Sequence, residues 1–135
     1  MRNTVNKFMV KSLLDPLGGS ADMDDNDSMK LLSVDGDNEE QVKRVISDHI
    51  LPYFNLKSNE YKASAKRSLN YFLHTKSADF GYLYDSCLIA FDHPQNPIQF
   101  FVWLWEVLFP LESLHLTESF DVEEISDPSE PNSYL

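Results

Sequence analysis

IQFFVWLWEVLF, residues 98–109, is the stretch that decides the fold, because only Gln99 and Glu106 interrupt its apolar side chains. A segment that is apolar on nearly all sides is typical of a helix packed against several neighbours. Asn96-Pro97 precedes it, and an N-cap asparagine followed by proline at the first helical position is typical of a helix start. Pro110 ends the pattern. We therefore expect a central helix over residues 98–109.

Amphipathic segments elsewhere in the chain are expected to cover this central helix. Their apolar residues recur at spacings of three and four, which predicts helices with one buried face. Ser58 and Ser77 stand at suitable N-cap positions. The predicted helices span residues 39–51, 58–74 and 77–91, with a short helix or strand at 3–15 and a short helix or edge strand after residue 110. The sequence thus predicts an all-α fold: a compact bundle of about four to five helices, in which short strand elements can form near the termini.

The chain organisation is that of a single domain over residues 1–135, because 135 residues and 15.6 kDa leave little room for a second. A hydrophobic content of 42% is enough to build one core. Residues 18–40 are acidic and rich in turn-forming residues, and we expect an acidic loop there. Residues 126–135 contain two prolines among polar residues and are expected to form an extended tail.

Several classes of protein are excluded by what the sequence lacks. No run reaches the ~18 apolar residues that a bilayer span requires. Residues 1–7 lack the apolar segment of a signal peptide. Cys87, the single cysteine, excludes an internal disulfide and suits a reducing compartment. We therefore expect a cytoplasmic protein without a membrane partner.

The charge distribution is the most informative feature of the sequence. The chain has 11 lysines and arginines against 22 aspartates and glutamates, a net charge of −11. Every lysine and arginine lies at or before Lys76, so residues 77–135 carry the whole net charge. This balance disfavours nucleic acid and anionic membranes as partners and favours a basic protein. The alternative is that the acidic surface serves solubility alone.

Catalytic motifs are missing from the sequence. Its four histidines have no metal-ligand spacing, and it contains no phosphate loop or dinucleotide-binding motif. Cys87 falls on the apolar stripe of a predicted helix without a basic neighbour, which indicates packing rather than nucleophilic chemistry. We therefore expect no enzyme, no metal and no cofactor. A site assembled from distant residues would leave no local motif, so the enzyme class stays open as an alternative.

The predicted partner-binding residues are acidic side chains of the C-terminal part together with one tryptophan. Trp103 shares the only polar stripe of the central helix with Gln99 and Glu106, and an exposed tryptophan there would anchor a partner. The alternative is a tryptophan buried in the core. The predicted partner-binding set is Asp79, Asp85, Trp103, Glu106, Glu112, Glu118, Asp121, Glu123 and Glu124.

The small size, acidic charge, single cysteine and aromatic helical core resemble the bacterial immunity proteins of contact-dependent growth inhibition. The resemblance also rests on residues 82–92, YLYDSCLIAFD, which lead into residues 97–106, PIQFFVWLWE. It implies a monomer that neutralises a cognate toxin, often a basic nuclease, in a 1:1 complex. Because immunity families differ in fold, the resemblance transfers no residue assignments.

Charge complementarity fits the role that the resemblance implies. A nuclease presents lysine and arginine to phosphate groups, so clustered carboxylates can occupy the same field and occlude its active site. A second interpretation is an acidic secretion chaperone that holds an effector protein on apolar patches, which would favour an α/β dimer. A third is a DNA mimic, which needs carboxylates spaced like phosphates along its surface.

Overall fold

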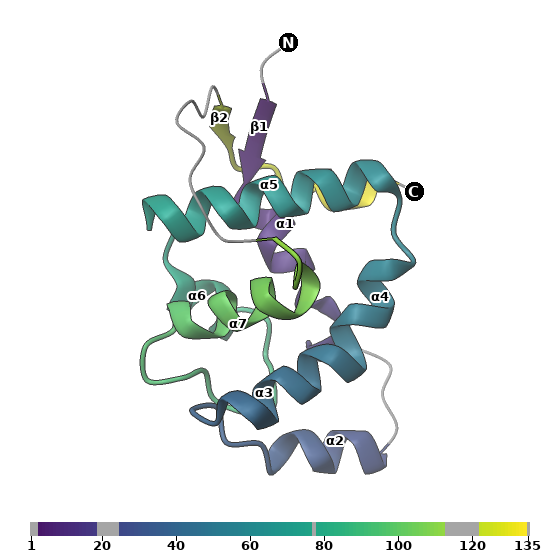
Figure 1. Ribbon diagram of the computed structural model, residues 1–135, viewed down its shortest axis with the longest axis vertical. Coiled ribbons are helices and arrows are strands. Elements are labelled where there is room, and N and C mark those ends of the chain that lie inside the picture. The colour runs from purple at the N-terminus through teal and green to yellow at the C-terminus, as the bar shows by residue number, and fades with distance from the viewer. Residues whose placement is uncertain (1–2, 19–24, 77, 113–121, 135) are drawn as a thin grey trace.

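The computed structural model describes residues 3–18, 25–76, 78–112 and 122–134, and it is mostly helical (Figure 1). The prediction of a compact helical fold is confirmed, and short strands do form near both ends of the chain. In chain order the elements are β1 (Asn3–Asn6), α1 (Lys7–Ser12), the 3-10 turn η1 (Asp15–Leu17), α2 (Asp25–Leu32), α3 (Glu39–Val45), the π-helical segment η2 (Ile46–Ile50), α4 (Leu51–Asn55), α5 (Asn59–Thr75), α6 (Phe80–Asp85), α7 (Ile98–Leu108), β2 (Val122–Ile125) and the 3-10 turn η3 (Glu130–Ser133).

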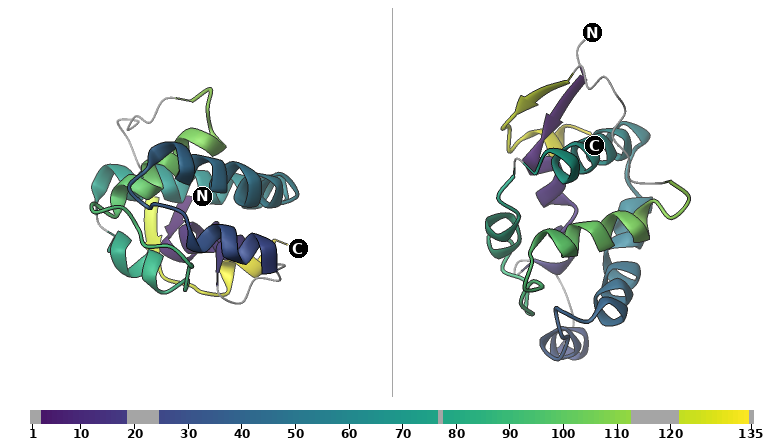
Figure 2. Two further views of the ribbon diagram at one scale, coloured as in Figure 1. Left: turned by 90° about the horizontal axis from the view of Figure 1, so that it is seen from below. Right: turned by 60° about the vertical axis from the view of Figure 1, so that its left-hand side comes forward.

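Helix α7 lies at the centre of the fold, as its sequence predicts. It contacts α3, α4, α5, α6 and η2, and Figures 1 and 2 show it crossing the molecule between α5 and α3. Phe100, Phe101 and Leu104 are completely buried. Because apolar residues occupy nearly every side of α7, no single neighbour can cover it, and the other helices are arranged around it.

Pro52 lies inside a helical stretch rather than at its end. The segments α3, η2 and α4 follow one another without a break. Proline cannot donate a hydrogen bond to the preceding turn, and its ring collides with the carbonyl four residues back. The wider turn of η2 directly precedes Pro52, and in it the Leu51 N–H donates to the Ile46 carbonyl. This local widening allows the helix to continue through the proline.

The prediction of an acidic loop over residues 18–40 is wrong in part, because Asp25–Leu32 form the helix α2. Leu31 is buried, so the helix places one leucine against the core. One turn of apolar residues within an aspartate-rich segment gives too little periodicity to reveal the helix. Residues 19–24 lie outside the described residues.

The helix predicted over residues 77–91 is much shorter in the structure, where α6 ends at Asp85. Leu88 has a left-handed φ of 56°, through which a right-handed helix cannot continue. Phe91 is nevertheless buried, and its carbonyl accepts a hydrogen bond from the Tyr84 hydroxyl at 2.7 Å. The apolar spacing of this segment is therefore satisfied by a short helix and a loop packed together, which the sequence pattern does not distinguish from one longer helix.

The extended tail predicted over residues 126–135 is also corrected. Glu130–Ser133 form the turn η3, which contacts α1. Pro131 stands at the start of this turn, where its fixed φ and missing N–H are acceptable. The Tyr134 ring lies edge-on to Tyr61, with 6.3 Å between ring centroids. The described end of the chain is therefore docked on the helical body.

Asn6 joins both ends of the chain to α5. It is completely buried, and its backbone N–H donates a hydrogen bond to Ser68 Oγ at 3.0 Å. Its side-chain amide donates to the Asp127 carbonyl and to Glu130 Oε1, both at 2.8 Å. The parallel pairing of β1 with β2 ends at the same residue, where Asn6 lies opposite Ile125. One buried amide thus holds three segments that are far apart in sequence.

Glu130 collects hydrogen bonds from three parts of the chain. Besides Asn6, its carboxylate accepts from Ser64 Oγ at 2.8 Å and from the Tyr134 hydroxyl at 2.7 Å. Burial on its own would raise the pKa of Glu130, but these hydrogen bonds and the nearby charge of Arg67 outweigh it and hold the pKa below its usual value. The ionised carboxylate therefore stabilises the docking of the C-terminal segment.

We expect Glu130→Gln to lower the free energy of unfolding at pH 7 by about 1–2 kcal/mol, because an ionised carboxylate accepts stronger hydrogen bonds than an amide. Since the folded-state pKa is depressed, this stabilisation is complete above the unfolded pKa and is lost as the pH falls through the folded value. Denaturant titrations at pH 7 and in acid should show the difference between wild type and variant becoming smaller in acid. The matched control is Glu123→Gln, at an exposed position on β2. A difference that does not change with pH would contradict this interpretation.

Candidate partner-binding surface

Two of the predicted acidic residues are already paired within the chain. Glu106 Oε2 lies 3.0 Å from Lys43 Nζ, and Glu112 forms an ion pair with Lys66. These lysines belong to α3 and α5, whereas the glutamates belong to α7 and the segment after it. Basic residues of the first half therefore offset part of the acidic second half inside the molecule. Part of the negative charge of the second half of the chain is thus neutralised by lysines of the first half.

The acidic residues near β2 form a smaller group. Glu123 is exposed on β2. Glu124 accepts a hydrogen bond from the Tyr71 hydroxyl at 2.7 Å. The predicted positions Glu118 and Asp121 lie outside the described residues. In the described part of this group, the Glu124 carboxylate is thus bound to α5 through Tyr71.

Trp103 is not the exposed anchor that the polar stripe of the central helix suggested. Its side chain is 6% exposed, and Trp105 is buried as well. The indole N–H of Trp105 donates to the Glu112 carbonyl at 3.1 Å. Helices α3 and α5 both pack against α7. The polar stripe of α7, in which Glu106 is the exposed carboxylate, is therefore too narrow to leave Trp103 in solvent. The alternative of a core tryptophan is the one that the structure supports.

Asp79 and Asp85 lie together with two exposed apolar side chains. Asp79 is the N-cap of α6, in place of the predicted Ser77, and its Oδ1 accepts a hydrogen bond from the Tyr82 N–H at 3.0 Å. Tyr82 and Asp85 are three residues apart and therefore neighbours on the helix surface. Leu88 follows directly, and its N–H donates to the Asp85 carbonyl at 3.2 Å. We name Asp79, Tyr82, Asp85 and Leu88 the α6 strip.

The two apolar members of the α6 strip are open to solvent. Tyr82 is 71% exposed and Leu88 is 75% exposed. Asp79 and Asp85 are exposed as well. Exposed apolar patches rimmed by polar residues mark interaction sites, and tyrosine is among the residues that contribute most to binding energy. The α6 strip therefore combines an apolar contact area with negative charge.

A second acidic feature adjoins the end of α6. Asp85 Oδ1 lies 3.9 Å from His93 Nε2, and His93 also lines a hollow of about 290 Å³ together with Asp35, Asp37 and Asp92. We name this the aspartate hollow. None of the described residues that line it is a lysine or arginine. The α6 strip and the aspartate hollow thus form one acidic edge of the molecule.

Contacts between two distant loops build the aspartate hollow. Gly36 packs so closely against the other loop that an added Cβ would lie 1.9 Å from the Asp92 carbonyl oxygen, so only glycine fits at this position. The Gln95 N–H donates to Asp37 Oδ1 at 2.7 Å. Figure 1 shows the loop after α6 meeting the loop that leads into α3. These contacts fix the aspartates of both loops on the same edge.

Sequence reasoning did not include Asp35, Asp37 and Asp92 in the predicted binding set. Asp35 and Asp37 flank a glycine turn, and Asp92 precedes a proline-containing stretch, so each reads locally as a turn residue. Only the packing of Gly36 against the Asp92 carbonyl brings them together. No spacing rule relates two loops so far apart in the sequence.

The carboxylates of this edge differ from those of α7 in how they are neutralised. Within the described ranges, Asp35, Asp37, Asp79, Asp85 and Asp92 form no ion pair with a lysine or arginine. Their hydrogen bonds are to backbone N–H groups, as in the contacts of Asp37 and Asp79. Their negative charge is therefore available to a basic partner.

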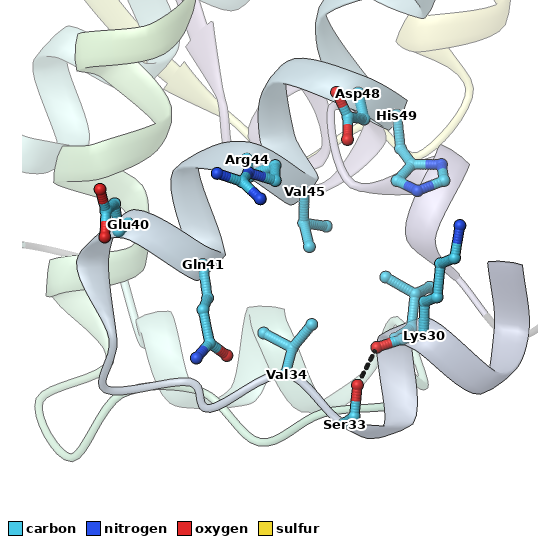
Figure 3. A pocket seen from close by; sticks show the side chains of 10 residues that line it. Lys30, Ser33, Val34, Glu40, Gln41, Arg44, Val45, Asp48 and His49 are labelled. Carbon is cyan, nitrogen blue, oxygen red and sulfur yellow. Dashed lines mark hydrogen bonds between the residues drawn. The ribbon is translucent and has the colours of Figure 1, made fainter.

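A hollow of about 680 Å³ lies between α2 and the α3–η2 stretch. Figure 3 shows Lys30 and His49 reaching toward the same side of it, while Glu40 lies at the opposite end. Ser33 donates its hydroxyl hydrogen to the Lys30 carbonyl at 2.8 Å and makes no contact with His49. Side chains of both charges line this hollow, and the groups drawn there do not form a nucleophile–base pair.

Chemical groups for metal binding are not assembled in the described residues. Among them, no three histidine, cysteine, aspartate or glutamate side chains are placed so that they could hold a metal ion. No helix in that part of the chain has the length and apolar character needed to cross a membrane.

No protein-family model, curated protein or solved structure matches the chain.

Cys87 lies beside the α6 strip but is held in the packing. It is half-buried, and its Sγ donates to the Leu83 carbonyl at 3.3 Å. Burial raises the pKa of its thiol to about 11. Because the thiolate is the reactive form, Cys87 is a weak nucleophile at neutral pH. The interpretation of Cys87 as a packing residue agrees with this environment.

We expect iodoacetamide at pH 8 to modify Cys87 in the folded protein at least about tenfold more slowly than in the unfolded chain, because each pKa unit above the pH lowers the thiolate fraction about tenfold. Mass spectrometry of samples taken over time, with and without denaturant, measures both rates on the one thiol of the chain. Equal rates would show that the thiol is neither buried nor shifted as described.

Proposed function

We propose that this protein is an immunity-type inhibitor that binds a basic toxin protein, such as a nuclease domain, through its acidic edge. The supporting observation is that five aspartates of the α6 strip and the aspartate hollow lie on one edge without a lysine or arginine partner among the described residues. Tyr82 and Leu88 stand exposed beside them. In this proposal the inhibitor forms a 1:1 complex and blocks the active site of the toxin.

Electrostatics supports a basic protein as the partner. A surface that binds phosphate groups presents lysine and arginine, and an acidic edge complements that surface. Complementary charges increase the rate of encounter and disfavour partners of like charge. Lysines in α3 and α5 pair with the glutamates near α7, whereas none of the five aspartates of the acidic edge has a lysine or arginine partner among the described residues. This edge therefore offers a group of unpaired carboxylates to a basic partner.

The mixture of apolar and acidic groups separates this proposal from two alternatives. A DNA mimic needs only carboxylates spaced like phosphates, whereas the α6 strip also exposes a tyrosine and a leucine. A secretion chaperone needs a broad apolar face. Among the described residues, the exposed large apolar side chains are instead spread over α2, the turn after α4, α6, the turn after it and the segment after α7, at Met29, Leu32, Leu56, Tyr82, Leu88 and Leu111.

Charge removal on the acidic edge tests the proposal. We expect the triple variant Asp79→Asn, Asp85→Asn, Asp92→Asn to weaken binding of the partner roughly tenfold or more, because interface charge contributes to both encounter and specificity. Asparagine replaces aspartate well as an N-cap, so α6 should stay intact. The matched control is Asp48→Asn, Glu60→Gln, Glu123→Gln, which removes the same charge from exposed positions elsewhere.

The measurement begins with the tagged wild-type chain, captured from its native cells at low salt and eluted with rising salt. Mass spectrometry identifies the protein that salt releases, and calorimetry with that purified protein compares the two triple variants. Co-expression then tests whether the chain protects cells from the captured protein. Equal binding by both variants, or capture that does not respond to salt, would contradict the proposal.

A further inference from the structure

Leu88 and Lys76 are the two non-glycine residues with positive φ in the described part of the chain, at 56° and 52°. Each follows the end of a helix: Lys76 caps α5 and Leu88 lies just after α6. The left-handed conformation is unfavourable for residues with a Cβ, and helices that end this way usually have glycine there. Both positions therefore hold a residue that the local backbone does not favour.

Leu88 departs from a second expectation that Lys76 meets. An exposed lysine is ordinary, but Leu88 is an aliphatic side chain that is 75% exposed. Glycine at this position would relieve the backbone and remove exposed apolar surface together. A residue that is unfavourable both in backbone conformation and in exposure is a sign of selection for something other than stability.

The surroundings of Leu88 indicate what that other purpose is. Its N–H donates to the Asp85 carbonyl at 3.2 Å, which fixes it at the end of the α6 strip. Tyr82 and two aspartates of the strip belong to the same surface. The sequence Tyr82 to Leu88 has no lysine or arginine. An apolar side chain within an acidic surface complements a partner that has an apolar site within a basic surface.

We propose that Leu88 is the apolar anchor of the α6 strip, and that its partner is a protein with an apolar recess bordered by lysine or arginine. This inference rests on the proposed function and specifies the partner surface. Charge directs the partner to the acidic edge, and insertion of Leu88 selects the protein that has the recess. A basic surface without the recess is attracted but not held.

The variant Leu88→Gly tests the anchor, and Lys76→Gly is its matched control. Both variants place glycine at a left-handed position after a helix, so both should unfold at or above the wild-type midpoint. We expect Leu88→Gly to weaken binding of the purified salt-released protein roughly 10- to 100-fold, as for a buried leucine, and Lys76→Gly to leave it unchanged. The affinities are measured by calorimetry at several salt concentrations.

The salt dependence separates the anchor from the charges. Leu88→Gly should weaken binding equally at every salt concentration, whereas Asp85→Asn should reduce the dependence on salt. Wild-type affinity in Leu88→Gly, or a lower unfolding midpoint than Lys76→Gly, would overturn the inference while the proposed function stands. If the wild-type chain captures no salt-sensitive protein, both the proposed function and this inference are overturned.

Discussion

The structure depends on the need of α7 to be covered on nearly every side. An amphipathic helix can be satisfied by one neighbour, but a helix without a continuous polar face needs several. Helices α3, α4, α5 and α6 all contact α7, and Phe100, Phe101 and Leu104 lose all contact with solvent. The same requirement explains the burial of Trp103 and the ion pairs that α3 and α5 form with glutamates near α7. Packing around one helix thus decides which charges are neutralised internally.

Sequence patterns predicted the elements that have strong local signals. Ser58 and the apolar stripe after it identify α5, and the composition of residues 98–109 identifies α7. The patterns failed where tertiary contacts decide the outcome. Phe91 keeps helical spacing with Tyr84 but packs against it from a loop. Helix α2 is stabilised by the burial of Leu31 in the core, which its local sequence does not reveal. Local periodicity records which side chains are buried, and it does not record whether a helix or a loop delivers them.

The candidate surface shows the same division between local and tertiary information. Asp79 and Asp85 are both in the set predicted from sequence, and helix geometry places them on one short helix. Asp35, Asp37 and Asp92 could not be related by any spacing, because the contact of Gly36 with the Asp92 carbonyl brings their loops together. Glu106 and Glu112 were predicted on charge alone, which does not reveal that Lys43 and Lys66 lie within reach. Net charge describes a sequence, whereas available charge depends on the fold.

The pairing of β1 with β2 determines the order in which the chain can fold during synthesis. Residues 3–6 pair with residues 122–125, and Asn6 bonds to residues 127 and 130. The first strand therefore waits for the last segment, on the order of ten seconds at ribosomal rates of about 5–20 residues per second. Helix α7 is also made late, so the earlier helices have no central partner while the ribosome is still translating. The β1–β2 pairing and the packing around α7 can consequently be completed only after residues 98–130 have been made.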